Sequence, residues 1–239
     1  MRAEILKGLK EILFPLYCFT CKTKITDNKH FSGVCYNCID AIKYNKPPFC
    51  YTCGAHTEDL SKARCKNCSD KIFHCSCVWS ACLYEGVIKE LLTLLKYDGY
   101  TKIAQLLGKI MIDFIENHNV PINEIDLIMP IPLYKRKLRE REFNQAELLA
   151  NIITKHFNKE LSVDNLVKIK DTQAQALLDK QTRLNNLKDT FQIKNSSLVK
   201  NRSILIIDDV LTTGTTCSEA AKTLKESGAN LVLALSLAQ

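Results

Sequence analysis

The residues with the clearest chemical potential lie near the C-terminus, where two acids precede a turn rich in hydroxyl groups. Asp208 and Asp209 close the apolar, β-branched run 204–207, which is typical of a parallel strand buried on both faces. Gly214 then lies in a turn ahead of a helical pattern over 218–227. The hydroxyl residues of this turn are Thr212, Thr213, Thr215 and Thr216. Backbone N–H groups at a helix start attract an anion, and the carboxylates suit vicinal hydroxyls or a Mg²⁺ beside it. The pattern predicts a ribose-phosphate site.

The stretch 203–216 resembles the phosphoribosyl pyrophosphate (PRPP) loop of type I phosphoribosyltransferases. In that family the paired acids hold the 2′- and 3′-hydroxyls of the ribose, and the loop holds the 5′-phosphate. The resemblance therefore implies that Asp208 and Asp209 face the sugar and that residues 212–216 face the phosphate. The simpler alternative is an ordinary βα turn with these residues by chance. The chain contains neither a G-x-G-x-x-G motif nor a P-loop motif that would compete.

A second chemistry is carried by cysteines in the first third of the chain. Eight of them form four C-x-x-C pairs: Cys18, Cys21, Cys35, Cys38, Cys50, Cys53, Cys65 and Cys68. Two thiolates at this spacing can reach one tetrahedral ion, and two pairs complete its shell. A single pair would also fit a redox motif, but four pairs so close together favour zinc. We predict two structural zinc ions on consecutive pairs; the spacing alone leaves interleaved pairing open.

A third cluster consists of cations that follow Pro132. Five of them fall within seven residues: Lys135, Arg136, Lys137, Arg139 and Arg141. Guanidinium groups bind phosphates through paired donors, which suits a pyrophosphate leaving group. They suit a nucleic-acid backbone equally well. The simplest alternative is a solvated, charged loop that binds no ligand. Under all three interpretations we expect this segment to be a loop.

These clusters need elements to position them, and the second part of the chain alternates strand and helix. The predicted strands cover 78–84, 125–131, 166–169 and 204–207, and the predicted helices cover 87–96, 102–115, 143–157 and 218–227. Such alternation is typical of a parallel α/β sheet, in which ligands bind beyond the carboxyl ends of the strands. The acid pair and the basic segment both fall at that edge.

Composition divides the chain in two. Ten of the twelve cysteines lie between Cys18 and Cys77, and residues 1–80 carry 12 Lys/Arg against 7 Asp/Glu. We therefore predict a small zinc-ribbon domain over 1–77, with a short amphipathic helix at its start, and an α/β domain over 78–239. Lysines among aromatic residues in the first domain suit single-stranded nucleic acid, although a solvated basic surface is the plain alternative.

The sequence also bears on the compartment. No apolar run is long enough for a transmembrane segment or a signal peptide. Clustered cysteines that serve as metal ligands are typical of a reducing compartment, so we expect a cytoplasmic protein. The remaining cysteines are expected to be packed thiols: Cys75, Cys77, Cys82 and Cys217.

The whole arrangement resembles the ComF family, which joins zinc ribbons to a phosphoribosyltransferase-like domain. The pattern P-x-P-L…R-x-x-R-x-R-x-FNQA over 130–146 carries this resemblance, which implies that Asn144 and Gln145 act with Arg136, Arg139 and Arg141. A second, spaced pattern corresponds to a mobile loop over the site in that family: Thr172, Gln175, Leu178, Arg183, Asn186 and Phe191. Two positions depart from the family. Glu142 stands where glycine is usual, and Tyr134 where histidine is common.

The resemblance implies a protein that binds PRPP or a nucleotide 5′-phosphate and holds single-stranded DNA during DNA uptake in natural transformation, together with protein partners of the uptake machinery. The alternative is an active, Mg²⁺-dependent phosphoribosyltransferase whose acceptor is not evident. Thr212 stands where purine-salvage relatives carry an aspartate base, which argues against a purine acceptor. A PRPP-sensing regulator is a third reading, which the absence of an evident helix-turn-helix pattern disfavours.

Overall fold

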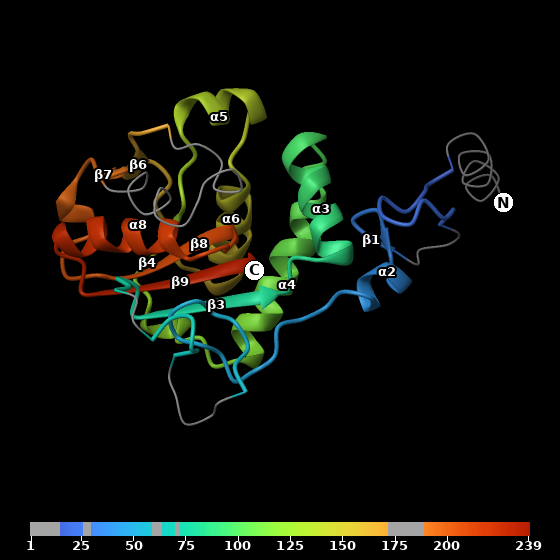
Figure 1. Cartoon of the computed structure of the whole chain (residues 1–239). Helices are drawn as coiled ribbons and strands as arrows, with labels where there is room; N and C mark the ends of the chain where they lie inside the picture. The colour runs from blue at the N-terminus through green and yellow to red at the C-terminus, as the bar shows by residue number, and fades with distance from the viewer. Residues whose placement is uncertain (1–14, 26–29, 59–63, 70–71, 172–188) are drawn as a thin grey trace.

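The computed structural model describes residues 15–25, 30–58, 64–69, 72–171 and 189–239 (Figure 1). The helix expected in the first dozen residues therefore lies outside the described residues. Among the helices within these ranges, none combines the length and the apolar character needed to cross a bilayer.

The second part of the chain is built on a parallel five-stranded sheet with the order β3-β9-β8-β4-β5. The strands are β3 (Cys77–Cys82), β4 (Leu127–Pro130), β5 (Glu160–Leu161), β8 (Ser203–Val210) and β9 (Leu231–Ala238). Pro130 of β4 pairs with Ile207 of β8, so the segments that follow these strands leave the sheet at the same edge. The predicted parallel α/β sheet is confirmed.

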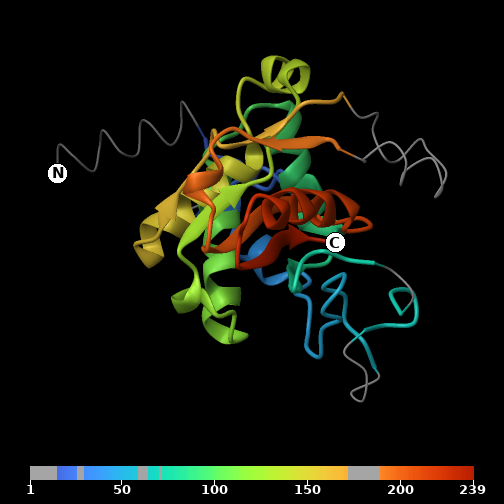
Figure 2. The same cartoon turned by 90° about the vertical axis from the view of Figure 1, so that its left-hand side faces the viewer.

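The alternation of side chains along β8 explains why helices cover both faces of the sheet. Leu205 and Ile207 are buried together with residues of α3, α4 and α6, whereas Ile204 and Ile206 are buried together with residues of α8 (Figure 2). These helices are α3 (Gly86–Tyr97), α4 (Ile103–Asn117), α6 (Gln145–Phe157) and α8 (Thr215–Glu226). Two 3₁₀ helices, η1 (Ile122–Glu124) and η3 (Ser196–Leu198), lie in the connections.

One strand that the alternation assigned to the sheet lies elsewhere. The predicted strand 166–169 is β6 (Leu166–Lys168), which pairs antiparallel with β7 (Phe191–Ile193) in a separate two-stranded sheet. Leu166 and Phe191 are buried on the α8 side of the main sheet. The two strands β6 and β7 therefore pack on the α8 side of the main sheet and do not extend it. Two strands of the main sheet, β5 and β9, had no counterpart among the predicted strands.

The cysteine-rich part consists of two successive ribbons; Figure 1 shows the first (blue) beside α3 and the second (cyan) beneath β3. The first contains β1 (His30–Phe31), β2 (Val34–Cys35) and α2 (Tyr36–Asp40). Both ribbons open with the same turn. The N–H of Lys22 donates to the carbonyl of Cys18 at 3.0 Å, and that of Gly54 donates to Cys50 at 2.8 Å. Lys22 and Gly54 both have positive φ, 58° and 73°, which bends each C-x-x-C pair into a knuckle.

Candidate functional site

The acid pair lies at the carboxyl end of β8, in the centre of the sheet. Asp209 forms an ion pair with Lys96, which reaches it from the last turn of α3, and both side chains are 15% exposed. The N–H of Asp209 donates to Oδ1 of Asp208 at 2.8 Å. Burial, followed by the neighbouring charge of Asp209, raises the pKa of Asp208 to about 8. At neutral pH the protonated form of Asp208 is therefore favoured.

The predicted phosphate loop follows directly. Gly214 has a φ of 71° and is the N-cap of α8, which begins at Thr215, earlier than the predicted start at residue 218. The hydroxyls of Thr213 and Thr215 lie 2.7 Å apart, and the N–H of Ser218 donates to the carbonyl of Gly214 at 2.9 Å. Glycine adopts this φ without the steric cost that a Cβ brings. Thr215 and Thr216 thus belong to the first turn of a helix whose N-terminus can face an anion.

A segment from the second ribbon covers this loop, which we did not predict. A Cβ built on Gly214 would lie 2.6 Å from Cζ of Phe73, so the Phe73 ring contacts the glycine directly. The N–H of His74 donates to Oγ of Ser218 in the first turns of α8 at 3.0 Å. The chain that leaves the second cysteine cluster therefore packs on the candidate phosphate site.

The expectation of a loop for the basic segment is wrong, because residues Lys135–Arg141 form helix α5. The C-cap of this helix is Glu142, which has a left-handed φ of 65°. This conformation explains why a glycine suits that position. Arg136 is engaged with Asp171 at 3.0 Å and with Glu140 at 3.8 Å. Arg139 is exposed, and within the described ranges it forms no ion pair.

Asn144 and Gln145 fasten the end of α5 to the edge of the sheet. Nδ2 of Asn144 donates to the carbonyl of Ile131, directly after β4, at 2.9 Å. Oε1 of Gln145 accepts a hydrogen bond from Nη1 of Arg141 at 3.1 Å, and the Arg141 guanidinium lies 5.3 Å from the centre of the Tyr97 ring. Gln145 is 1% exposed, and its Nε2 has no hydrogen-bond partner among the described residues.

The structure thus brings two of the predicted sets together and leaves a third untested. The acid pair and residues 212–216 are closely spaced along the chain at one sheet edge. Helix α5 is linked to them indirectly through the end of α3, where Tyr97 contacts Arg141 and Lys96 pairs with Asp209. Thr172, Gln175, Arg183 and Asn186 lie outside the described residues. Sequence reasoning missed Lys96 and Phe73. A lysine in the last turn of a helix is expected at any helix end, and no motif singles it out.

The eight paired cysteines form two clusters in which the sulfur atoms lie within 4.8 Å of one another. One cluster contains Cys18, Cys21, Cys35 and Cys38, and the other Cys50, Cys53, Cys65 and Cys68. Backbone N–H groups of Cys35 and Cys65 donate to the sulfurs of Cys18 and Cys50 at 3.4 and 3.2 Å, which stabilises thiolates. Four thiolates on two knuckles are the donor set of structural zinc, so the clusters are consistent with two zinc sites on consecutive pairs.

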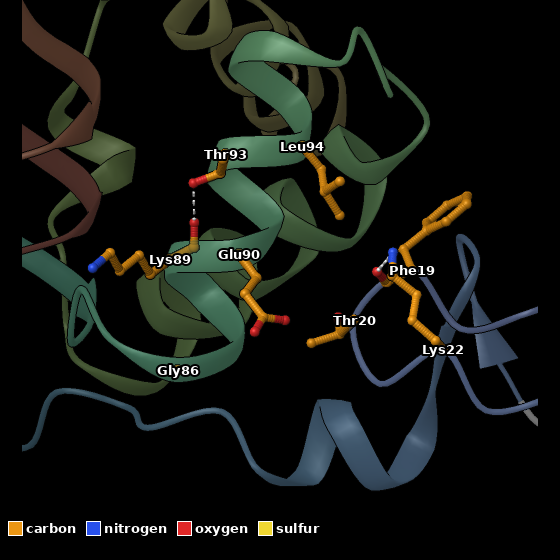
Figure 3. Close-up of a pocket in the computed structure, with 8 residues that line it drawn as sticks. All are labelled: Phe19, Thr20, Lys22, Gly86, Lys89, Glu90, Thr93 and Leu94. Atoms are coloured by element: carbon orange, nitrogen blue, oxygen red, sulfur yellow. Dashed lines mark hydrogen bonds between the residues drawn. The ribbon is translucent and has the colours of Figure 1, made fainter.

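A groove of about 510 Å³ separates the first ribbon from α3 (Figure 3). Its lining residues are Phe19, Thr20, Lys22, Gly86, Lys89, Glu90, Thr93 and Leu94. Figure 3 shows Glu90 pointing across the groove towards Thr20. Nζ of Lys22 donates to the carbonyl of Phe19 at 2.6 Å. The groove therefore carries both signs of charge and is not a simple anion channel.

Two family models match successive parts of this chain. A double zinc ribbon domain matches residues 9–73, and a phosphoribosyl transferase domain matches residues 144–238. Competence protein F of Haemophilus influenzae is 28% identical over 95% of this chain and 98% of its own. Competence protein ComFC of Bacillus subtilis is 27% identical over 90% and 91% of the two chains.

A further relative is DNA utilization protein YhgH of Escherichia coli, 26% identical over 91% of this chain and 94% of its own. Among solved structures, an allosteric regulatory enzyme of purine biosynthesis overlaps 57% of this chain and 26% of its own, with 16% identity and a TM-score of 0.38, a likeness too weak to bear on function. The two cysteine tetrads, the parallel sheet and relatives that match along nearly the whole chain show that this protein has the domain organisation of the ComF family, a double zinc ribbon joined to a phosphoribosyltransferase domain.

Proposed function

We propose that this protein binds the ribose 5-phosphate portion of PRPP or of a nucleotide at the carboxyl edge of its sheet. One observation carries the proposal: Asp208 and Asp209 end a central strand directly ahead of a loop whose Gly214 has positive φ and caps the N-terminus of α8. Carboxylates accept hydrogen bonds from vicinal hydroxyls, and the loop with its helix start attracts the phosphate. The two groups of donors and acceptors follow each other directly along the chain, so each can serve one end of the same sugar phosphate.

Magnesium would accompany PRPP at this site. Carboxylate oxygens are the donor class that Mg²⁺ prefers, so Asp208, once deprotonated, and Asp209 are the residues that would hold an ion beside the ribose. When bound, the ion would neutralise charge on the pyrophosphate. Lys96 has a role of its own: it holds Asp209 in place before the ligand arrives and keeps the local charge low.

The same protein is proposed to hold single-stranded DNA during DNA uptake. The names of its relatives, competence protein and DNA utilization protein, support this role. So does the ribbon surface, where exposed aromatic rings accompany lysines: Tyr17 is 50% exposed and pairs across a short bridge with Lys24, and Tyr44 is 46% exposed beside Lys43. Aromatic rings among cations are the usual platform for single strands.

Calorimetric titration with PRPP and Mg²⁺ tests the ribose-phosphate site. The unaltered protein should bind, and the double substitution Asp208→Ala with Asp209→Ala should abolish binding, because both sugar acceptors are lost. Asp113→Ala is the matched control, since this exposed aspartate pairs with Lys109 on α4 away from the sheet edge. The proposal is wrong if the double variant binds as tightly as the unaltered protein.

Turnover is the second candidate, and Arg139 on α5 favours it, because an exposed guanidinium that forms no ion pair among the described residues could take up the leaving pyrophosphate. Pyrophosphate release is the measurement that separates the two functions. Release from PRPP and Mg²⁺ that depends on an added acceptor would establish a phosphoribosyltransferase. Binding without release under every acceptor tried would leave the binding function.

A further inference from the structure

Tyr97 is unusually exposed for an aromatic residue so close to the acid pair. It is the last residue of α3 and is 71% exposed, more than any other tyrosine among the described residues. The residue before it, Lys96, is 15% exposed and ion-paired with Asp209. The end of α3 is thus anchored on the proposed sugar site by the residue that directly precedes the exposed tyrosine.

The ring is also held in orientation. The Arg141 guanidinium lies 5.3 Å from its centre, a distance at which a cation is attracted by the face of an aromatic ring. Arg141 is itself fixed by its hydrogen bond to Gln145 at 3.1 Å, and Gln145 is almost completely buried. The guanidinium is therefore held over the Tyr97 ring by a contact to the buried part of α6.

A second contact fixes the turn behind the ring. Tyr100 packs on Phe19 of the first ribbon with ring centres 4.8 Å apart, and Gly99 between the two tyrosines has a φ of 67°. The turn that carries Tyr97 is therefore tied at one end to Asp209 and at the other end to the first ribbon. Figure 1 shows the end of α3 and helix α5 rising on the same side of the strands.

We infer that Tyr97 is the platform on which the planar ring of a bound nucleotide stacks, so that the ligand class of this site is a nucleoside 5′-phosphate. The inference rests on the proposed ribose-phosphate site. The phosphate lies on the loop at Gly214, the sugar hydroxyls face the acid pair, and the base extends along Lys96 to the tyrosine ring. Stacking tolerates any base, since every base has a π face, and a site that recognises nucleotides in this way does not select a sequence.

The experiment compares two ligands that differ only in the base. Affinities for ribose 5-phosphate and for adenosine 5′-monophosphate are measured by calorimetry on the unaltered protein, on Tyr97→Ala and on Tyr97→Phe. The nucleotide should bind more tightly than the sugar phosphate, and Tyr97→Ala should reduce nucleotide affinity by about tenfold without changing affinity for ribose 5-phosphate. Tyr97→Phe keeps the aromatic face and should retain the preference.

The controls separate the two proposals. Tyr51→Ala removes another exposed tyrosine, 54% exposed in the second ribbon, and should change neither affinity. If neither ligand binds the unaltered protein, the ribose-phosphate site itself is refuted. If both ligands bind but the nucleotide has no advantage, or Tyr97→Ala lowers both affinities equally, the sugar-phosphate site stands and the stacking platform is refuted.

Discussion

The ring of Phe73 contacts Gly214 so closely that a Cβ on the glycine would lie 2.6 Å from Cζ of the ring. The two residues belong to different parts of the chain. Phe73 comes five residues after Cys68, the last ligand of the second cysteine cluster, and Gly214 caps the helix that begins the proposed phosphate site. The second ribbon therefore forms one wall of that site, and a change in one part should be measurable in the other.

Gly214→Ala should destabilise the protein by more than the cost of its backbone conformation alone. A positive φ costs an alanine about 1–2 kcal/mol, and the contact with Phe73 adds to this. Gly99→Ala is the matched control, because Gly99 has a φ of 67° and open space where its Cβ would be. Chemical unfolding of both variants gives the difference. The excess should disappear when Phe73→Ala is combined with Gly214→Ala; an excess that persists would show that the ring is not its cause.

Loss of zinc from the second cluster should weaken phosphate binding at the proposed site, whereas loss of zinc from the first cluster should not. We expect about two zinc ions per chain by elemental analysis, and about one after either Cys18→Ser or Cys50→Ser. Each ion contributes on the order of 10 kcal/mol to the folding of its ribbon. Cys50→Ser should therefore free the segment that carries Phe73 and weaken ribose 5-phosphate binding. Equal binding by the two variants would contradict this link, and protein without zinc would contradict both sites.

The stability of the ligand-free protein should fall as pH rises from about 4 to about 8 through the contribution of Asp208. Its pKa is raised to about 8 by burial and then by Asp209, whereas an unfolded chain loses this proton near its ordinary pKa of about 3.9. Between these values the folded protein binds one proton more, so ΔG of unfolding decreases with pH, by at most about 1.4 kcal/mol per unit.

Asp208→Asn removes this titration while it keeps the shape of the side chain. Urea unfolding at several pH values between 5 and 8 should give a flatter dependence for the variant than for the unaltered protein. Other titrating groups affect both proteins alike and cancel in the comparison. Parallel curves for the two proteins would show that Asp208 is ionised in the folded state.

Local sequence signals are sufficient to predict a structural feature when one continuous stretch of the chain forms that feature. The apolar run before Asp208 and the spacing of Cys18 with Cys21 each predict a structure that needs no distant partner. The signals failed where a partner lies far along the chain. Nothing near Lys96 reveals that it pairs with Asp209, and nothing near Phe73 indicates Gly214, because such contacts depend on which element each residue happens to face.

The basic segment 135–141 shows a second limit of prediction from the sequence. The run of five cations between Lys135 and Arg141 suggests a solvated loop, but Arg and Lys are good helix formers and the segment is helix α5. The strand 166–169 was correct as a strand, yet its place outside the main sheet depends on β7, which comes after it by more than twenty residues. The spacing of apolar residues along the chain predicts whether a segment is a helix or a strand. Which other elements that segment contacts is decided by tertiary packing.

Single-stranded DNA binding should depend on salt, and Arg139→Ala should flatten that dependence if α5 touches the strand. Each phosphate neutralised on a single strand contributes about −0.7 to the slope of log K against log salt concentration. Arg139 is the appropriate arginine to change, because Arg136 is paired with Asp171 and Arg141 lies against Tyr97.

Arg202→Ala is the matched control for this measurement. Arg202 directly precedes β8 and pairs with Glu160 at 2.7 Å, so it lies at the opposite, amino-terminal edge of the sheet. Both variants lose one positive charge, and a general effect of net charge would appear in both. A slope that becomes less steep by about 0.7 in Arg139→Ala alone places DNA beside α5. Equal slopes in the two variants would exclude α5 from the DNA path and leave the lysines of the ribbons as the surface to test next.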